Sequence, residues 1–267
     1  MPFTVSHAAA VLPLLDGVRA RGPLVASALV AGSMAPDVPF FAASLLPGVY
    51  RLGGPTHRWW AVATVDVALA AGLVAAWHGL LRGPLVALLP PGAARAAEAA
   101  SVRTGHGPSA RRAGWFAVSA ALGAATHVGW DGFTHEGRCG VRLLPVLDRR
   151  VAGLPLYGVL QHGCSVAGLG WLTRYAVRAA GRLEPVRPSV ELPRGWRPAV
   201  AALLGAATAA GAAQRLARRE RNPVNELCFG AGAGLAAGAV GYATAARLRG
   251  RRDRRTGGRA QARRAAA

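Results

Sequence analysis

Long runs of non-polar residues, separated by short arginine-containing stretches, dominate the chain. A membrane-spanning helix needs about 20 mainly apolar residues, and five or six segments approach that length. The first, residues 23–50, contains Pro36 and Pro39 on either side of Asp37, so we expect a broken or re-entrant segment. The other segments are 59–81, 112–133, 156–177, 198–213 and 226–246. The pattern predicts an all-α, polytopic transmembrane helix bundle.

Three regions differ in how polar residues are distributed. Residues 1–180 hold the histidines and aspartates that interrupt the apolar runs, and we expect them to form a membrane-embedded core. Residues 181–246 are expected to add two short hydrophobic helices, and the basic tail 247–267 is expected to be disordered. The first residues lack the basic region of a cleaved signal peptide, so we expect His7 to remain in the mature protein.

Composition supports the membrane interpretation. Hydrophobic residues make up 52% and charged residues 16% of the chain, whereas soluble domains carry about 25% charged residues. The net charge is +20, and every basic side chain other than histidine is arginine. These arginines punctuate apolar runs, as in the cytoplasmic loops of membrane proteins, instead of clustering as in a nucleic-acid-binding domain. We expect membrane lipids, and no nucleic acid, as partners.

The stretch THVGWDGFTH, residues 126–135, ends one of the apolar runs. On a helix His127, Asp131 and His135 follow each other at intervals of four and share one face. Neutral imidazole and carboxylate together suit zinc, iron or manganese. Alternatively, Asp131 could hold His127 in one tautomer as a hydrogen-bonded pair. This stretch alone leaves both interpretations open.

Other polar residues lie near the ends of predicted spans. His57 in PTHRWW precedes the second span, and His162 lies in the first turns of the fourth. Alternating topology puts both on the membrane face where His127 and Asp131 lie. His7 and His57 could instead be ordinary surface or interfacial histidines. A carboxylate at Asp37, between prolines in an apolar run, needs a cation or backbone donors as partners.

Four stretches agree in order and spacing with one known family. They are MPFTVSHAAAVLPL, GSMAPDVPFF, THVGWDGFTH and LPLYGVLQHGCSVAGL. Over residues 1 to about 180, they resemble a bacterial membrane-protein family catalogued as domain of unknown function 4184. The arrangement also distantly resembles inner-membrane proteins regarded as metal-dependent hydrolases. The resemblance implies a protein integral to the cytoplasmic (inner) membrane of a bacterium.

The resemblance also implies a divalent-metal site, with zinc favoured and manganese or iron as alternatives. The corresponding ligands are His7, Asp37, His57, His127 and Asp131. Those hydrolases often carry a second acidic residue where this chain has Val38 and Pro39, so one carboxylate of a two-metal site is missing there. His135 and His162 could substitute, and they are the candidate catalytic groups.

Three functions follow as hypotheses. The first is a metal-dependent hydrolase acting on an amphiphilic substrate, a lipid or a lipid-linked phosphate or ester. The second is a proton- or ion-coupled transporter that uses intramembrane histidines and aspartates as a relay. The third is a non-catalytic membrane scaffold in which these residues only pair with one another.

Overall fold

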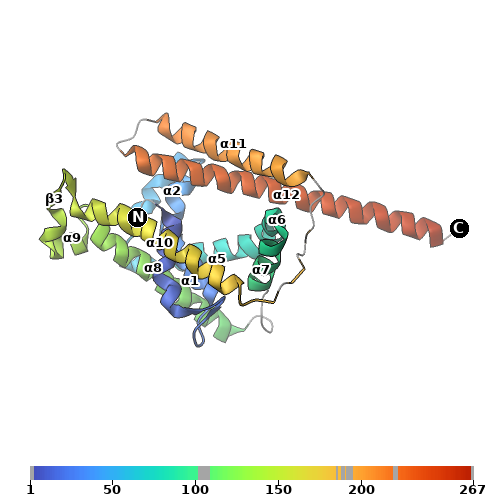
Figure 1. Cartoon of the computed structure of the whole chain (residues 1–267), viewed down its shortest axis with the longest axis horizontal. Coiled ribbons are helices and arrows are strands. Elements are labelled where there is room, and N and C mark those ends of the chain that lie inside the picture. The colour runs from blue at the N-terminus through green and yellow to red at the C-terminus, as the bar shows by residue number, and fades with distance from the viewer. Residues whose placement is uncertain are drawn as a thin grey trace.

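The computed structural model describes residues 3–101, 109–184, 186–187, 190, 195–218 and 222–265. This part of the chain is mainly helical, with two hairpins of two-residue strands. Figure 1 shows the helices gathered around the N-terminal segment, and the long last helix extending well beyond them.

The first quarter of the chain folds into short elements. They are η1 (Thr4–Leu14), β1 (Leu15–Asp16), β2 (Arg19–Ala20), α1 (Ala26–Met34), η2 (Ala35–Asp37), α2 (Val38–Ala42), η3 (Pro47–Leu52), α3 (Gly53–Thr56) and α4 (Trp59–Val62). The predicted segment 23–50 is indeed broken, because Pro36 and Pro39 lie where α1, η2 and α2 follow one another. The break brings Asp37 into the interior, where its side chain is buried.

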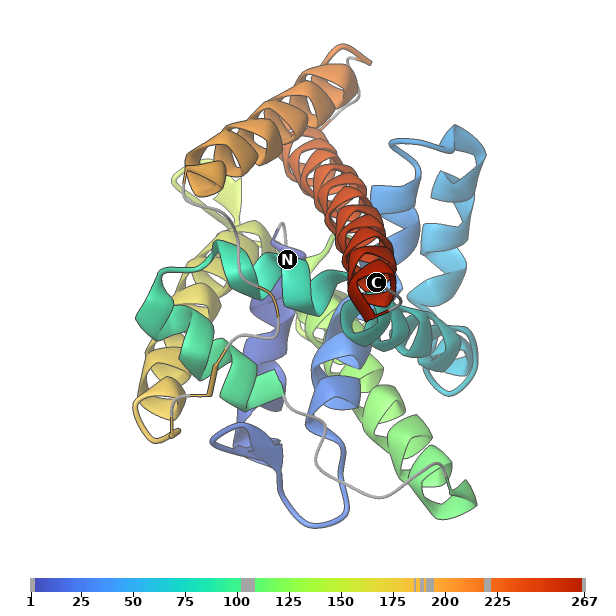
Figure 2. The ribbon, with the colours of Figure 1, turned by 90° about the vertical axis from the view of Figure 1, so that its right-hand side faces the viewer.

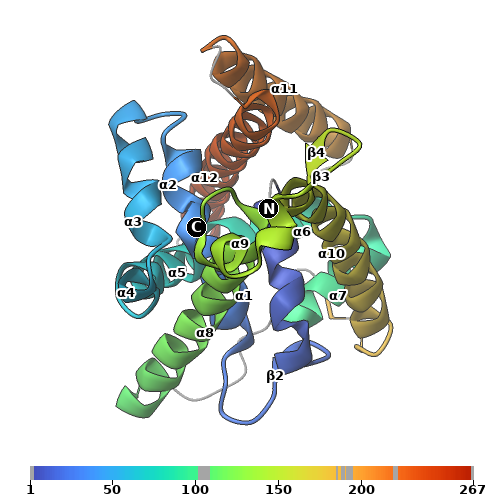
Figure 3. The same cartoon turned by 90° about the vertical axis from the view of Figure 1, so that its left-hand side faces the viewer.

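Longer helices make up the rest. They are α5 (Val65–Ala76), the π-helical η4 (Trp77–Leu81), α6 (Arg82–Leu88), α7 (Pro91–Ser101), α8 (Ala110–Thr134), α9 (Cys139–Leu143), η5 (Pro145–Asp148), α10 (Leu156–Ala180), α11 (Trp196–Leu216) and α12 (Pro223–Ala265). Strands β3 (Arg150–Val151) and β4 (Leu154–Pro155) form a hairpin before α10. Figure 3 shows η1 between α10 on one side and α1 with α8 on the other.

Three helical stretches among the described residues are long and apolar enough to cross a membrane: Val65–Leu88, Trp196–Leu216 and Pro223–Gly250. The five or six predicted spans are therefore not confirmed. Helices α8 and α10 cover two of the predicted spans, but polar residues such as Asp131 and Gln161 interrupt them. The span predicted at 59–81 begins later, because the chain turns between α4 and α5.

Two glycines let α1 and α8 pack with their backbones in contact. A Cβ atom on Gly32 would lie 2.1 Å from the carbonyl oxygen of Ala120, and one on Gly123 would lie 2.2 Å from that of Leu29. Only glycine fits at such distances. The crossing places the last turn of α1 against His127 on α8, so it positions part of the site described below.

Helices α11 and α12 form a hairpin beside this core (Figure 2). Gly230, Gly234 and Gly238 recur every four residues on α12, and a Cβ on Gly234 would lie 2.1 Å from the carbonyl oxygen of Ala207 on α11. Small residues at this spacing allow membrane helices to approach closely. Both helices are longer than the short ones predicted. Helix α12 continues to Ala265, through most of the tail predicted to be disordered, and residues 266–267 lie outside the described part.

A buried ion pair closes the α11–α12 hairpin. Nε of Arg215 lies 2.7 Å from Oε2 of Glu226, and its Nη2 donates a hydrogen bond of 3.0 Å to Oε1. Arg218 donates to the backbone oxygens of Ala43 and Ser44, which follow α2. The hairpin is thus fixed to the segment that carries Asp37.

Candidate metal centre

Four separate elements bring histidine and aspartate side chains to one point in the interior. His7 lies on η1, Asp37 ends η2, His57 follows α3, and His127 and Asp131 lie one turn apart on α8. All five side chains are buried. These are the five residues that the family resemblance implies as metal ligands, and they come from positions up to 124 residues apart in the chain.

Nε2 of His57 and Nε2 of His127 lie at similar distances from each other and from one carboxylate oxygen each of Asp37 and Asp131. Nε2 of His57 lies 3.2 Å from Nε2 of His127, 3.3 Å from Oδ1 of Asp37 and 3.5 Å from Oδ2 of Asp131. Nε2 of His127 lies 3.6 Å from the same oxygen of Asp37 and 3.5 Å from that of Asp131. Five of the six separations in this set of four therefore fall between 3.2 and 3.6 Å.

These separations fit ligands of a shared ion better than hydrogen bonds. Nitrogen and oxygen atoms in good hydrogen bonds approach to about 2.7–3.2 Å, and the four nitrogen–oxygen distances are longer. Zinc bonds of about 2.0–2.1 Å in a tetrahedral arrangement separate neighbouring ligand atoms by about 3.3–3.4 Å. The observed distances match that spacing, so the residues present fit a divalent ion.

The second nitrogen of each of these two imidazoles is fixed by a backbone carbonyl. Nδ1 of His57 lies 2.8 Å from the oxygen of Gly53, and Nδ1 of His127 lies 2.8 Å from the oxygen of Ser33. A carbonyl oxygen only accepts hydrogen bonds, so each Nδ1 carries a proton and each Nε2 is the nitrogen left to bind an ion or a second proton. The two Nε2 atoms lie 3.2 Å apart, so a cation or a proton must lie between them.

His7 adds a third imidazole, from the other side of His127. The two rings stack with their centroids 3.6 Å apart and their planes inclined by 14°. Nε2 of His7 lies 3.5 Å from Oδ1 of Asp131, but neither ring nitrogen of this buried side chain makes a hydrogen bond with a residue that the structure describes. Buried polar atoms are normally satisfied. His7, His127 and Asp131 offer one ligand atom each within 4.8 Å of one another, which again fits an ion.

Burial and charge act in opposite directions on these groups. Burial alone would raise the pKa of Asp37, but the imidazoles of His127 and His57 hold it well below its usual range. Burial alone would lower the pKa of His57, but the neighbouring carboxylates of Asp131 and Asp37 raise it above its usual value. For His7, burial and the neighbouring His127 both act to keep its pKa well below the ordinary value. The aspartates therefore stay ionised and able to bind a cation.

The two candidate catalytic histidines occupy different surroundings. Nδ1 of His135 lies 3.5 Å from Oδ1 of Asp131, and its Nε2 lies 3.0 Å from the amide nitrogen of Gln161. Its side chain is 30% exposed, and burial lowers its pKa to about 4. His162 lies next to Gln161 but is exposed and stands outside the two groups of ligand atoms. His135 is thus placed beside the cluster, and the structure does not bring His162 into it.

Hydroxyl groups that the sequence reasoning passed over support the cluster. Thr4 donates a hydrogen bond to Oδ2 of Asp37, the oxygen that faces away from His57 and His127. Thr56 donates to the carbonyl oxygen of Pro36 at 2.7 Å and so ties α3 to η2. Thr4 precedes His7 by three residues and Thr56 directly precedes His57, and this proximity in sequence could have pointed to both threonines. A hydroxyl beside a ligand fixes the ligand's orientation.

The sequence was compared with protein-family models, with curated proteins and with solved structures. A family model described as "Domain of unknown function (DUF4184)" matches residues 1–244. The chain belongs to this family. No curated protein and no solved structure matches it. The DUF4184 match runs beyond residue 180 and takes in α11 and much of α12, so the hairpin and the His/Asp cluster lie in one family domain.

Proposed function

We propose that this DUF4184 protein is a metal-dependent hydrolase of the bacterial cytoplasmic membrane, with zinc as the favoured ion. His57, His127, Asp37 and Asp131 would hold the ion, and His7 would complete the site. One observation carries the proposal: the Nε2 atoms of His57 and His127 and carboxylate oxygens of Asp37 and Asp131 converge from separate elements at 3.2–3.6 Å. Simple pairing of these residues, as in a scaffold, would give shorter hydrogen bonds and satisfied nitrogens on His7.

The proposed chemistry is hydrolysis of a phosphoryl or acyl ester. A bound divalent ion supplies Lewis acidity toward water and toward the ester oxygen. Water contributes its oxygen to the phosphorus or carbon atom, and its proton passes to the leaving alcohol. His135 is the group placed to carry that proton, because it contacts Asp131 and is partly exposed. His162, exposed one residue after Gln161, remains a second candidate for proton transfer.

An amphiphilic substrate is supported by the surroundings of the cluster. Trp59 and Trp60 are 58% and 56% exposed and shortly precede Val65, where a candidate span begins. Tryptophan is enriched at membrane–water interfaces. A mainly apolar cavity of about 160 Å³, lined by residues that include Trp130 and Trp171, lies beside η1. The cluster thus has both an interfacial flank and an apolar neighbour, which suits a lipid or a lipid-linked substrate.

The test uses purified protein in detergent micelles that contain phosphatidic acid or a diacylglycerol ester. We expect release of phosphate or fatty acid that stops with a chelator and returns on adding zinc. A His127→Ala/Asp131→Ala variant should lose both zinc and activity, whereas Arg149→Gln, an exposed change outside the cluster, should keep both. Zinc that is bound equally by wild type and the double variant, or a wild type that binds none, would contradict the proposal.

One observation favours a proton- or ion-coupled transporter as the second candidate. Asp66 is fully buried in the candidate span Val65–Leu88, and neither of its carboxylate oxygens has a hydrogen-bond partner among the described residues. Such a residue inside a membrane segment often lies on an ion pathway. In proteoliposomes, proton or cation flux that Asp66→Asn abolishes, without any hydrolysis, would favour the transporter. Flux that is absent from wild type would exclude it.

A further inference from the structure

A cavity of about 240 Å³ opens beside the metal ligands. Its wall includes His57, a proposed ligand, and Val128 and Gly132, which directly follow His127 and Asp131 in the chain. The remaining wall residues are Arg58, Trp59, Gly137, Arg138, Cys139 and Arg142. A group bound here would therefore lie next to the side chains that hold the ion.

The cavity has a strong positive charge of its own. Arg58, Arg138 and Arg142 line it, and the described residues of its wall include no aspartate or glutamate. Within the described part of the chain, Arg82 and Arg215 pair with glutamates elsewhere, and none of the three cavity arginines pairs with a described carboxylate. Nearby charges of one sign in a hollow concentrate ions of the opposite sign. The cavity is therefore suited to an anion.

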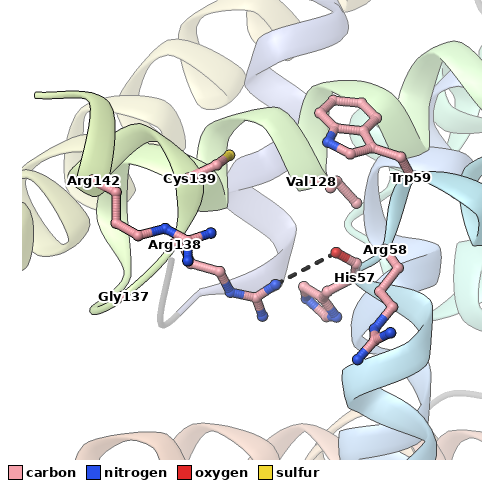
Figure 4. A pocket seen from close by; sticks show the side chains of 9 residues that line it. His57, Arg58, Trp59, Val128, Gly137, Arg138, Cys139 and Arg142 are labelled. Carbon is pink, nitrogen blue, oxygen red and sulfur yellow. Dashed lines mark hydrogen bonds between the residues drawn. The ribbon is translucent and has the colours of Figure 1, made fainter.

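One of these arginines contacts the backbone of His57. Figure 4 shows the guanidinium group of Arg138 reaching toward His57, whose carbonyl oxygen accepts a hydrogen bond of 3.4 Å from Nη1. In the same view Arg142 extends from α9 on the side of Arg138, and Arg58 lies beyond His57. The three side chains come from two separate segments, so the cavity depends on the fold and is not one run of basic sequence.

We propose that this cavity binds the phosphate group of the substrate, which makes the protein a phosphoester hydrolase. The inference rests on the proposed function and selects one substrate class within it. Planar guanidinium groups match phosphate oxygens and bind them with strong, charge-assisted hydrogen bonds. A neutral carboxylic ester would leave three arginines without an anionic partner. The phosphate belongs either to a lipid headgroup or to a soluble phosphoester.

Phosphate binding can be measured without turnover. Inorganic phosphate is titrated by calorimetry into detergent-purified wild type, into Arg138→Gln/Arg142→Gln and into Arg149→Gln, which changes an exposed arginine outside the cavity. We expect the double variant to bind phosphate at least about tenfold more weakly, because charge-assisted hydrogen bonds are lost. The Arg149→Gln variant should match wild type. Metal content is measured in every preparation.

The outcomes separate the two proposals. Wild type that holds zinc but binds phosphate no better than the double variant would overturn the phosphate site and leave the metal site intact. Absence of zinc from wild type, with phosphate binding that depends on Arg138 and Arg142, would refute the hydrolase alone. Equal weakening in Arg149→Gln would reduce the effect to net charge and overturn the inference.

Vesicles distinguish the two phosphate sources. Wild-type protein is reconstituted into phosphatidylcholine vesicles with and without phosphatidic acid. Binding of labelled inorganic phosphate to the protein is then compared between the two kinds of vesicle. Displacement of inorganic phosphate by phosphatidic acid identifies a lipid headgroup. Binding of inorganic phosphate that phosphatidic acid does not affect identifies a soluble phosphoester. Both results support the site, and binding of neither overturns it.

Discussion

Replacing Thr4 with valine tests the proposed metal centre without changing any of its proposed ligands. The hydroxyl of this buried residue donates to Oδ2 of Asp37, while Oδ1 of the same carboxylate faces His57 and His127. Valine has nearly the same shape and leaves Oδ2 without this donor. The carboxylate then loses the contact that fixes its orientation.

Loss of such a supporting hydrogen bond typically lowers metal affinity by about 10–100-fold. That range equals about 1.4–2.7 kcal/mol in binding free energy. We expect Thr4→Val to bind zinc about 10–100-fold more weakly than wild type, measured by competition with a chromogenic chelator. Thr4→Ser keeps the hydroxyl and should remain close to wild type. If Thr4→Val bound zinc as tightly as Thr4→Ser, Asp37 would not be a ligand held in place by this contact.

Three further predictions concern packing, charge and pH. Gly123→Ala should destabilise the purified protein by about 1–3 kcal/mol and lower its melting temperature, because the new methyl group would collide with the backbone of α1. Gly114→Ala on the same helix should leave the melting temperature unchanged, because the space around it is open. Glu226→Ala should cost about 3–5 kcal/mol by stranding Arg215, and an added Arg215→Met change should recover part of the loss in the same melting assay. Zinc affinity should fall as pH drops through the raised pKa of His57, and calorimetry near pH 7 in several buffers should detect proton release on binding; affinity independent of pH would contradict this.

The spacing along one helix made part of the site predictable. His127, Asp131 and His135 recur every four residues, so a helix puts them on one face whatever the rest of the chain does. Asp37 was conspicuous because a carboxylate between prolines in an apolar run has no solvent to face. The convergence of His7 and His57 with them depends on long-range packing, and the family resemblance, not periodicity, pointed to it.

The membrane topology was less predictable for a related reason. Hydropathy treats each apolar run alone, whereas the structure packs η1, α1 and α8 against one another. Some apolar residues of a run such as 112–133 are therefore buried against other helices of the protein, as Ala120 and Ala124 are. The arginine-lined cavity beside His57 was also hidden, because its wall combines residues 57–59 with residues 128–142.

X-ray absorption spectroscopy of zinc-reconstituted protein shows which atoms bind the ion. We expect one equivalent of zinc per chain, with nitrogen and oxygen ligands from histidine and carboxylate at about 2.0–2.2 Å. His127→Ala/Asp131→Ala should hold none, and His162→Ala should keep its zinc, because that exposed side chain stands outside the ligand groups. A sulfur-containing shell, or zinc retained by the double variant, would contradict the proposed centre.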